Sequence, residues 1–83
     1  MEIEFITPKK AAEYLSKNDP ENRPLNLKKV NLYKKEMENG NWKLRDSIGF
    51  CYDTGYLING QHRMAALAEA DITGVEFRVE HNG

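Results

Sequence analysis

Residues 59–63, with the sequence NGQHR, are the stretch of this chain best suited to bind an anion. They follow the short apolar segment 56–58 and precede a segment rich in Ala, Leu, Met and Glu, so we expect a helix to start at Asn59-Gly60. The first backbone N–H groups of a helix have no acceptor within the helix, and they lie at the positive end of its dipole. This helix start is therefore a natural seat for a phosphate group.

The side chains of the run have the chemistry of a phosphate site. Gly60 has no Cβ that would keep a phosphate away from the backbone. Arg63 follows by about one helical turn, so its guanidinium can reach back with two parallel hydrogen bonds, and His62 adds a donor when it is protonated. We predict a phosphate-binding site made by Gly60, Gln61, His62 and Arg63, with Asn59 as a further candidate.

Simpler interpretations of these residues stay open. An Asn-Gly pair before a helix is in most sequences a turn and a helix start, and Arg63 could pair with a surface carboxylate such as Glu69 or Asp53. His62 and His81 could suggest a metal site, but no cysteine or carboxylate stands at ligand spacing from them. We expect no metal bound by protein ligands.

The composition is that of one small domain, residues 1–83. Lys and Arg total 12 against 13 Asp and Glu, a formal net charge of -1, so no general attraction to nucleic acid or membranes is expected. No apolar stretch approaches membrane-spanning length, and the start MEIEFITPKK is acidic where a signal peptide is basic, which predicts a cytoplasmic protein. Cys51 has no second cysteine with which to form a disulfide or a thiolate zinc site.

The elements before the run follow from helix and turn signals. A first helix is expected over residues 8–17, because Thr7 suits the N-cap and Pro8 suits the first helical position. Two prolines then make residues 18–24 a loop, in which Arg23 is held in extended geometry.

A second helix is expected from near Asn26, with Gly40 at its C-terminal cap. Its apolar face would hold Leu27, Val30, Tyr33 and Met37. The lysine pairs 28–29 and 34–35 adjoin two glutamates, which favours a solvated helix face over contact with nucleic acid.

The pattern then changes to extended strands. Residues 47–58 are expected to form two antiparallel strands joined by a turn in which Gly55 takes a positive φ. The helix of residues 60–70 follows, with Ala66 small enough to let it sit near the sheet, and residues 75–79 form a last strand. The predicted order α-α-β-β-α-β is that of a small α+β domain, with three helices on a short mixed sheet. Its expected core includes Tyr33, Met37, Trp42, Phe50 and Phe77.

The segment TGYLINGQHRMAALAEADITGVEFRV resembles the ParB/sulfiredoxin superfamily, in which a strand delivers a Gly-x-x-Arg-x-x-Ala box to a helix start that binds nucleotide phosphates. Upstream, NDPENRPLNLKKVNLYKKEMENGNW is similar to the Asn-Pro-x-x-Arg/Pro segment and the following helix of ParB-type domains, so the resemblance spans residues 18–79. The run NGQHR is closest to the DGQHR subgroup and to short ParB-like proteins of phages and mobile elements, where Asp usually stands in place of Asn59.

The resemblance implies roles for individual residues. Gly60 and Arg63 match the positions that hold phosphate, His62 matches the histidine of sulfiredoxin-like and DGQHR-like members, and Ala66 matches the packing alanine. Arg23 corresponds less closely, since the ParB arginine that approaches the nucleotide follows the loop proline and Arg23 precedes it.

Two family activities are not expected here. Sulfiredoxins place their catalytic cysteine just before the His-Arg pair, where this chain has Gln61, and Cys51 lies in the predicted hairpin. ParB proteins carry a DNA-binding and a dimerisation region after the nucleotide domain, and this sequence ends at Gly83, so DNA loading by the ParB mechanism would need a partner.

Three functions remain as hypotheses. The first is a module that binds a nucleoside triphosphate, with Mg²⁺ carried by the ligand, or another phosphate. The second is a phosphoryl-transfer or nucleotide-hydrolysing enzyme, which needs a base; Asp46, Asp53 and Glu21 are candidates that no spacing distinguishes. The third is a nucleic-acid or protein interaction domain that keeps the fold without binding nucleotide.

Overall fold

The computed structural model describes residues 2–42 and 47–82. Within these ranges the chain forms, in order, β1 (Glu2–Ile6), α1 (Pro8–Leu15), α2 (Leu27–Glu38), β2 (Ser47–Cys51), β3 (Leu57–Asn59), α3 (Gln61–Glu69) and β4 (Val75–Asn82). The predicted helices and strands are therefore present, and β1 is added in front of them.

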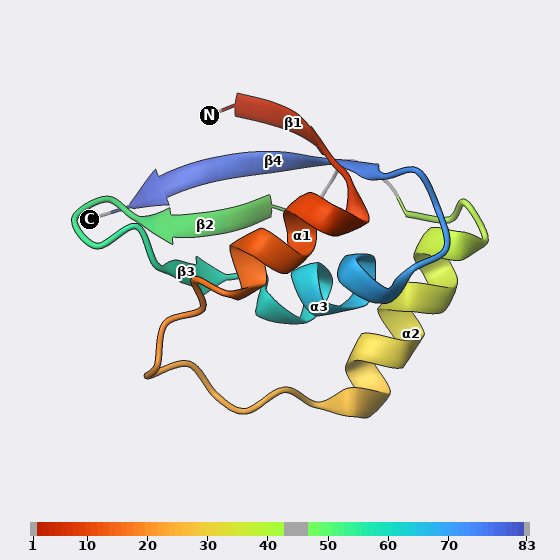
Figure 1. Ribbon diagram of the computed structural model, residues 1–83, viewed down its shortest axis with the longest axis horizontal. Helices are drawn as coiled ribbons and strands as arrows, with labels where there is room; N and C mark the ends of the chain where they lie inside the picture. Colours follow the sequence, from red (N-terminus) through yellow and green to blue (C-terminus); the bar gives the residue numbers. More distant parts are fainter. Residues whose placement is uncertain (1, 43–46, 83) are drawn as a thin grey trace.

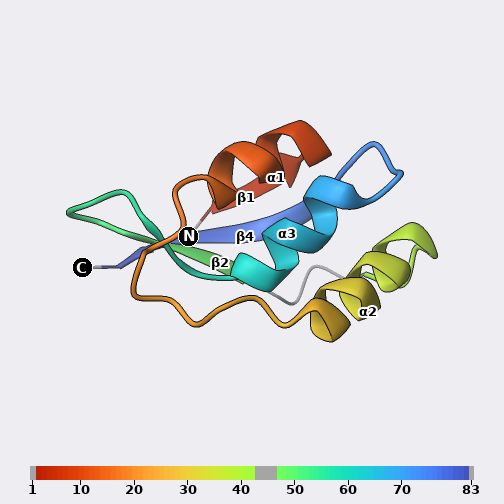
Figure 2. The same ribbon diagram turned by 60° about the horizontal axis from the view of Figure 1, so that its bottom comes forward.

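The strands form a mixed sheet with the order β1-β4-β2-β3 (Figure 1). β1 pairs antiparallel with β4, and β2 pairs antiparallel with β3, as predicted for the hairpin. β2 and β4 are parallel neighbours, joined through β3 and α3. α1 and α3 lie over one face of the sheet and α2 packs against α3, so the molecule is a small two-layer α+β domain (Figures 1 and 2).

The prediction was wrong in beginning the fold with a helix. β1 has the alternating pattern EIEFI, but its alternating apolar residues face solvent, whereas those of a half-buried strand face the core. Ile3 and Phe5 are 58% and 54% exposed, whereas Ile6 is the buried residue of the strand. β1 pairs with β4 through its backbone. The alternation Glu-Ile-Glu-Phe was a strand signal that the prediction missed, and it did not reveal which face is buried.

The N-cap predicted at Thr7 is present, and Asn26, near which the second helix was expected to start, is the N-cap of α2. The Thr7 hydroxyl accepts a hydrogen bond from the Lys10 N–H at 3.2 Å, and the Asn26 side chain accepts bonds from two N–H groups in the first turn of α2. α1 ends at Leu15, two residues earlier than predicted, and Gly40 takes the positive φ of +75° expected after α2. Among the described residues no helix is long and apolar enough to cross a membrane.

The core lies between the helices and the sheet. Met37, Phe50 and Phe77 are buried as predicted, while Trp42 is half-buried and packs its ring 5.8 Å from that of Phe77. The prediction for Leu27 was wrong, because this first residue of α2 is 71% exposed. The other fully buried large side chains are Ile6, Ile48, Leu57, Met64 and Leu67.

Candidate functional site

The start of α3 is set by Gly60, the residue between β3 and the helix. Gly60 has φ +93° and ψ 17°, a left-handed conformation that side-chain-bearing residues rarely adopt. A Cβ at this position would lie 2.7 Å from Cγ2 of Ile48 in β2, much closer than atoms can approach. The glycine was expected to make room for a phosphate; the structure instead explains it by the sharp turn and the close contact with β2.

The first turn of α3 presents backbone donors. Met64 N–H bonds to the Gly60 carbonyl at 2.9 Å, so the N–H groups of residues 61–63 have no acceptor in the preceding turn of the helix. Gly60, the N-cap, has no side chain that could accept a bond from them. This helix start therefore has the local positive potential that an anion site uses.

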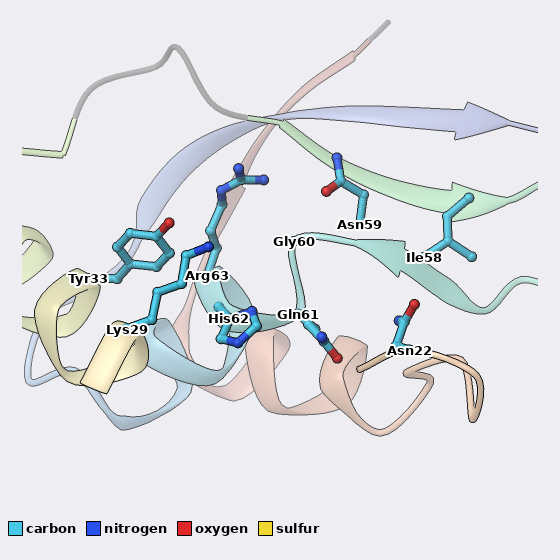
Figure 3. A pocket seen from close by; sticks show the side chains of 9 residues that line it. All are labelled: Asn22, Lys29, Tyr33, Ile58, Asn59, Gly60, Gln61, His62 and Arg63. Atoms are coloured by element: carbon cyan, nitrogen blue, oxygen red, sulfur yellow. The ribbon is translucent and has the colours of Figure 1, made fainter. Parts of the chain in front are cut away.

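A pocket of about 160 Å³ opens over this helix start (Figure 3). It is lined by Asn22, Lys29, Tyr33, Ile58, Asn59, Gly60, Gln61, His62 and Arg63. The lining comes from the loop after α1, from α2 and from the β3–α3 junction, and none of these described residues is Asp or Glu. Its volume is below the roughly 300 Å³ of a site that encloses a whole small molecule, so it fits a phosphate-sized group.

Arg63 reaches from α3 to the start of β2. Its Nη1 donates a hydrogen bond of 2.5 Å to the backbone carbonyl of Ser47. This contact differs from the surface pairs with Glu69 or Asp53 that the sequence suggested, and it fixes the guanidinium at the sheet side of the pocket (Figure 3). Arg63 therefore has a structural contact as well as a place in the lining.

His62 accepts a hydrogen bond through Nε2, whereas the sequence suggested that the protonated ring would donate. Its Nε2 accepts a hydrogen bond of 2.9 Å from the backbone N–H of Asn26, so the proton of the neutral ring lies on Nδ1. Burial lowers the pKa of His62, and the positive charges of Lys29 and Arg63 lower it further. The ring is thus kept neutral near pH 7, and the charge of the pocket comes from Lys29 and Arg63.

Gln61 ties the loop before α2 to the same helix start. Its Nε2 donates a hydrogen bond of 2.8 Å to the Arg23 carbonyl, while its Oε1 is buried and has no hydrogen-bond partner among the described residues. The Arg23 side chain is exposed and does not line the pocket, so this predicted candidate contributes its backbone to the site. Asn59 does line the pocket.

Four lining residues were missed from the sequence: Asn22, Lys29, Tyr33 and Ile58. Lys29 belongs to a lysine pair predicted to be solvated, and Tyr33 was placed in the core; the Lys29 Nζ lies 5.8 Å from the centre of the Tyr33 ring. Figure 3 shows the Lys29 side chain extending from α2 towards Arg63. Asn22 donates from Nδ2 to the Asn18 Oδ1 at 2.7 Å and to the Leu57 carbonyl at 2.8 Å, which fixes the loop against β3.

The candidate bases and Cys51 lie outside this lining. Glu21 and Asp53 do not line the pocket, and Asp46 lies outside the described residues. Cys51 ends β2, and hydrogen bonds from Thr54 and the backbone lower its pKa. It does not line the pocket at the start of α3. In residues 2–42 and 47–82 no three His, Cys, Asp or Glu side chains gather as a metal site would require.

Comparisons with protein-family models, with curated proteins and with solved structures give no match to this chain. The resemblance to the ParB/sulfiredoxin superfamily therefore depends on the motifs quoted above and on their order along the chain. The geometry of the pocket has to carry any functional argument.

Proposed function

We propose that this protein is a ParB/sulfiredoxin-like domain that binds the phosphates of a nucleotide, or another phosphate ligand, at the start of α3. The position of the motif supports this: NGQHR spans the end of β3, the glycine turn and the first turn of a helix. In the ParB/sulfiredoxin superfamily, which the sequence resembles, phosphate binds at this strand-to-helix junction.

The convergence of positive charge on this junction carries the proposal. Lys29 comes from α2 and Arg63 from α3. Both line the pocket that lies over the first turn of α3. Two cations and a helix N-terminus around a pocket whose described lining has no carboxylate give a local field for an anion, even though the chain has a net charge of -1.

The size of the pocket defines how a nucleotide would sit. About 160 Å³ admits phosphate groups but not the base and sugar as well. The phosphates would then occupy the pocket, the nucleoside would lie outside it, and Mg²⁺ would arrive with the ligand because the described lining offers no carboxylate to hold it.

A binding module fits the site better than a phosphoryl-transfer enzyme. Such an enzyme needs a group that orients or deprotonates its nucleophile. Among the lining residues, His62 has the side chain best suited to act as a general base. Its Nε2, however, already accepts a hydrogen bond from the Asn26 backbone N–H. We therefore infer binding without turnover.

A thermal-shift screen tests the proposal. The whole chain is heated with CTP, ATP, GTP, their diphosphates and inorganic pyrophosphate, each with and without Mg²⁺. A ligand present at about 100 times its Kd stabilises the folded state by about 2.7 kcal/mol, which gives a clear rise in Tm. The absence of a shift with every phosphate compound at millimolar concentration would reject the proposal.

A further inference from the structure

The outer edge of β1 is open to pairing. β1 pairs with β4 on one side, and in the part of the chain that the structure describes no strand lies on its other side. The strand contains no proline or register shift, but it is short and carries Glu2 and Glu4, charges of the kind that limit pairing of an exposed edge with another copy of the same strand. The opposite edge of the sheet is covered: in β3, Leu57 N–H donates to the Lys17 carbonyl at 2.7 Å and Leu57 O accepts from Asp19 N–H at 3.0 Å.

The face of β1 that points away from the helices is apolar. Ile3 and Phe5 stand two residues apart on this face, and each exposes more than half of its side chain. Phe5 also borders a pocket of about 280 Å³ beside Trp42 and Val75. The Trp42 indole Nε1 is buried and has no acceptor among the described residues.

The other face of β1 is acidic. Glu2 and Glu4 line a second pocket of about 280 Å³, and the Tyr14 hydroxyl, which donates to Glu4, lies 2.7 and 2.9 Å from the two carboxylate oxygens. Burial and this bond to Glu4 raise the pKa of Tyr14, so the tyrosine stays a donor that orients the carboxylate. Phe50, Tyr52 and His81 add aromatic surface, while Lys17 is the basic residue of the lining.

We propose that β1 is a docking edge for an extended segment of a partner protein in which basic and apolar residues alternate. The segment adds as a strand, so its main chain bonds to the edge and its side chains alternate between the two faces. Basic side chains then meet Glu2 and Glu4, and apolar side chains cover Ile3 and Phe5.

Charge selects this occupant over a second copy of the chain. Glu2 and Glu4 are on the same face of β1, so pairing two β1 strands would place carboxylates beside carboxylates. Like charges on neighbouring strands destabilise the pair, whereas a lysine or arginine opposite a glutamate stabilises it. The surface therefore fits a basic strand from another protein.

Two labelled peptides and one variant test the proposal. The probes are a short peptide of alternating Lys and Val and its counterpart of alternating Glu and Val, with binding followed by fluorescence anisotropy and by the amide signals of β1 in NMR. We expect the Lys peptide to bind and the Glu peptide not to bind. Glu2→Lys, at an exposed position, should weaken Lys-peptide binding roughly tenfold, because an attraction becomes a repulsion.

Glu69→Lys makes the same charge change at an exposed position of α3 that lines neither pocket, and as the matched control it should leave peptide binding unchanged. Lack of binding by the Lys peptide at millimolar concentration, equal binding of both peptides, or equal affinity of wild type and Glu2→Lys would overturn the docking edge. So would signal changes confined to α3, which would instead place the peptide at the phosphate pocket. The nucleotide screen is independent of these results.

Discussion

The Nε2 atom of His62 accepts a hydrogen bond from the backbone N–H of Asn26 at 2.9 Å. His62 is in the first turn of α3, and Asn26 is the N-cap of α2. One bond thus joins the starts of the two helices that supply Arg63 and Lys29 to the pocket. Protonation of His62 removes the acceptor, so the geometry of the pocket is linked to pH.

Stability should fall as the pH is lowered below about 6.5. The pKa of His62 is lower in the folded protein than in the unfolded chain, so the unfolded chain binds the proton first as the pH falls. The stability due to neutral His62 is complete above the unfolded pKa and is lost from about 6.5 down to the folded pKa. Urea unfolding at several pH values measures this loss.

His62→Gln provides the control for that experiment. The amide can accept a bond from Asn26 but does not titrate, so the loss of stability between pH 6.5 and 5 should shrink in the variant. A variant with the same pH dependence as the wild type would show that His62 is not the titrating group.

Alanine at Gly60 should cost far more stability than alanine at Gly55. Both glycines have a positive φ, +93° and +76°, and each substitution costs about 1 kcal/mol or more for that conformation. At Gly60 the new Cβ also meets Ile48, whereas nothing lies within 4 Å at Gly55. We expect about 1 kcal/mol for Gly55→Ala and about 2–4 kcal/mol for Gly60→Ala in urea unfolding. Equal losses would mean that the contact with Ile48 relaxes.

The sequence predicted the elements that have local signals. Thr7 caps the helix that it was expected to cap, the second helix starts next to Asn26 as predicted, and Gly55 closes the predicted hairpin. β1 had a local signal, the alternation Glu-Ile-Glu-Phe, which the prediction missed. The alternation could not show that Ile3 and Phe5 point outwards, or that the partner strand lies at the other end of the chain.

The candidate site was predicted in position but not in all of its contacts. The run NGQHR lies at the start of α3, where residues 59–63 all line one pocket. His62 accepts from a residue 36 positions away, and Arg23 contributes a carbonyl 38 positions from Gln61. Such contacts depend on how loop 18–24 and α2 fold over α3, which residue spacing does not encode; Lys29 was missed for the same reason.

Lys29→Ala should weaken phosphate binding, while Lys28→Ala should not. Lys29 lines the pocket, whereas its exposed neighbour Lys28 does not. A hydrogen bond between charged groups contributes about 1.5–3 kcal/mol, so the Kd for the phosphate compound that stabilises the wild type should rise by about tenfold or more. Calorimetric titration measures it. A similar loss in both variants would indicate general charge attraction instead of a site.

Arg63→Lys and Arg63→Ala separate the structural contact of this side chain from its role in binding. The guanidinium donates to the Ser47 carbonyl, so Arg63→Ala should lower the free energy of unfolding by about 1–2 kcal/mol without any ligand. Arg63→Lys keeps the positive charge but cannot form two parallel bonds to a phosphate. If Arg63 binds the ligand through its planar fork, the lysine variant should also lose affinity about tenfold while keeping more of the stability. A lysine variant that binds phosphate as tightly as the wild type would show that Arg63 contributes only its positive charge and its structural contact. Lys29 and the first turn of α3 would then be the groups that bind the phosphate directly.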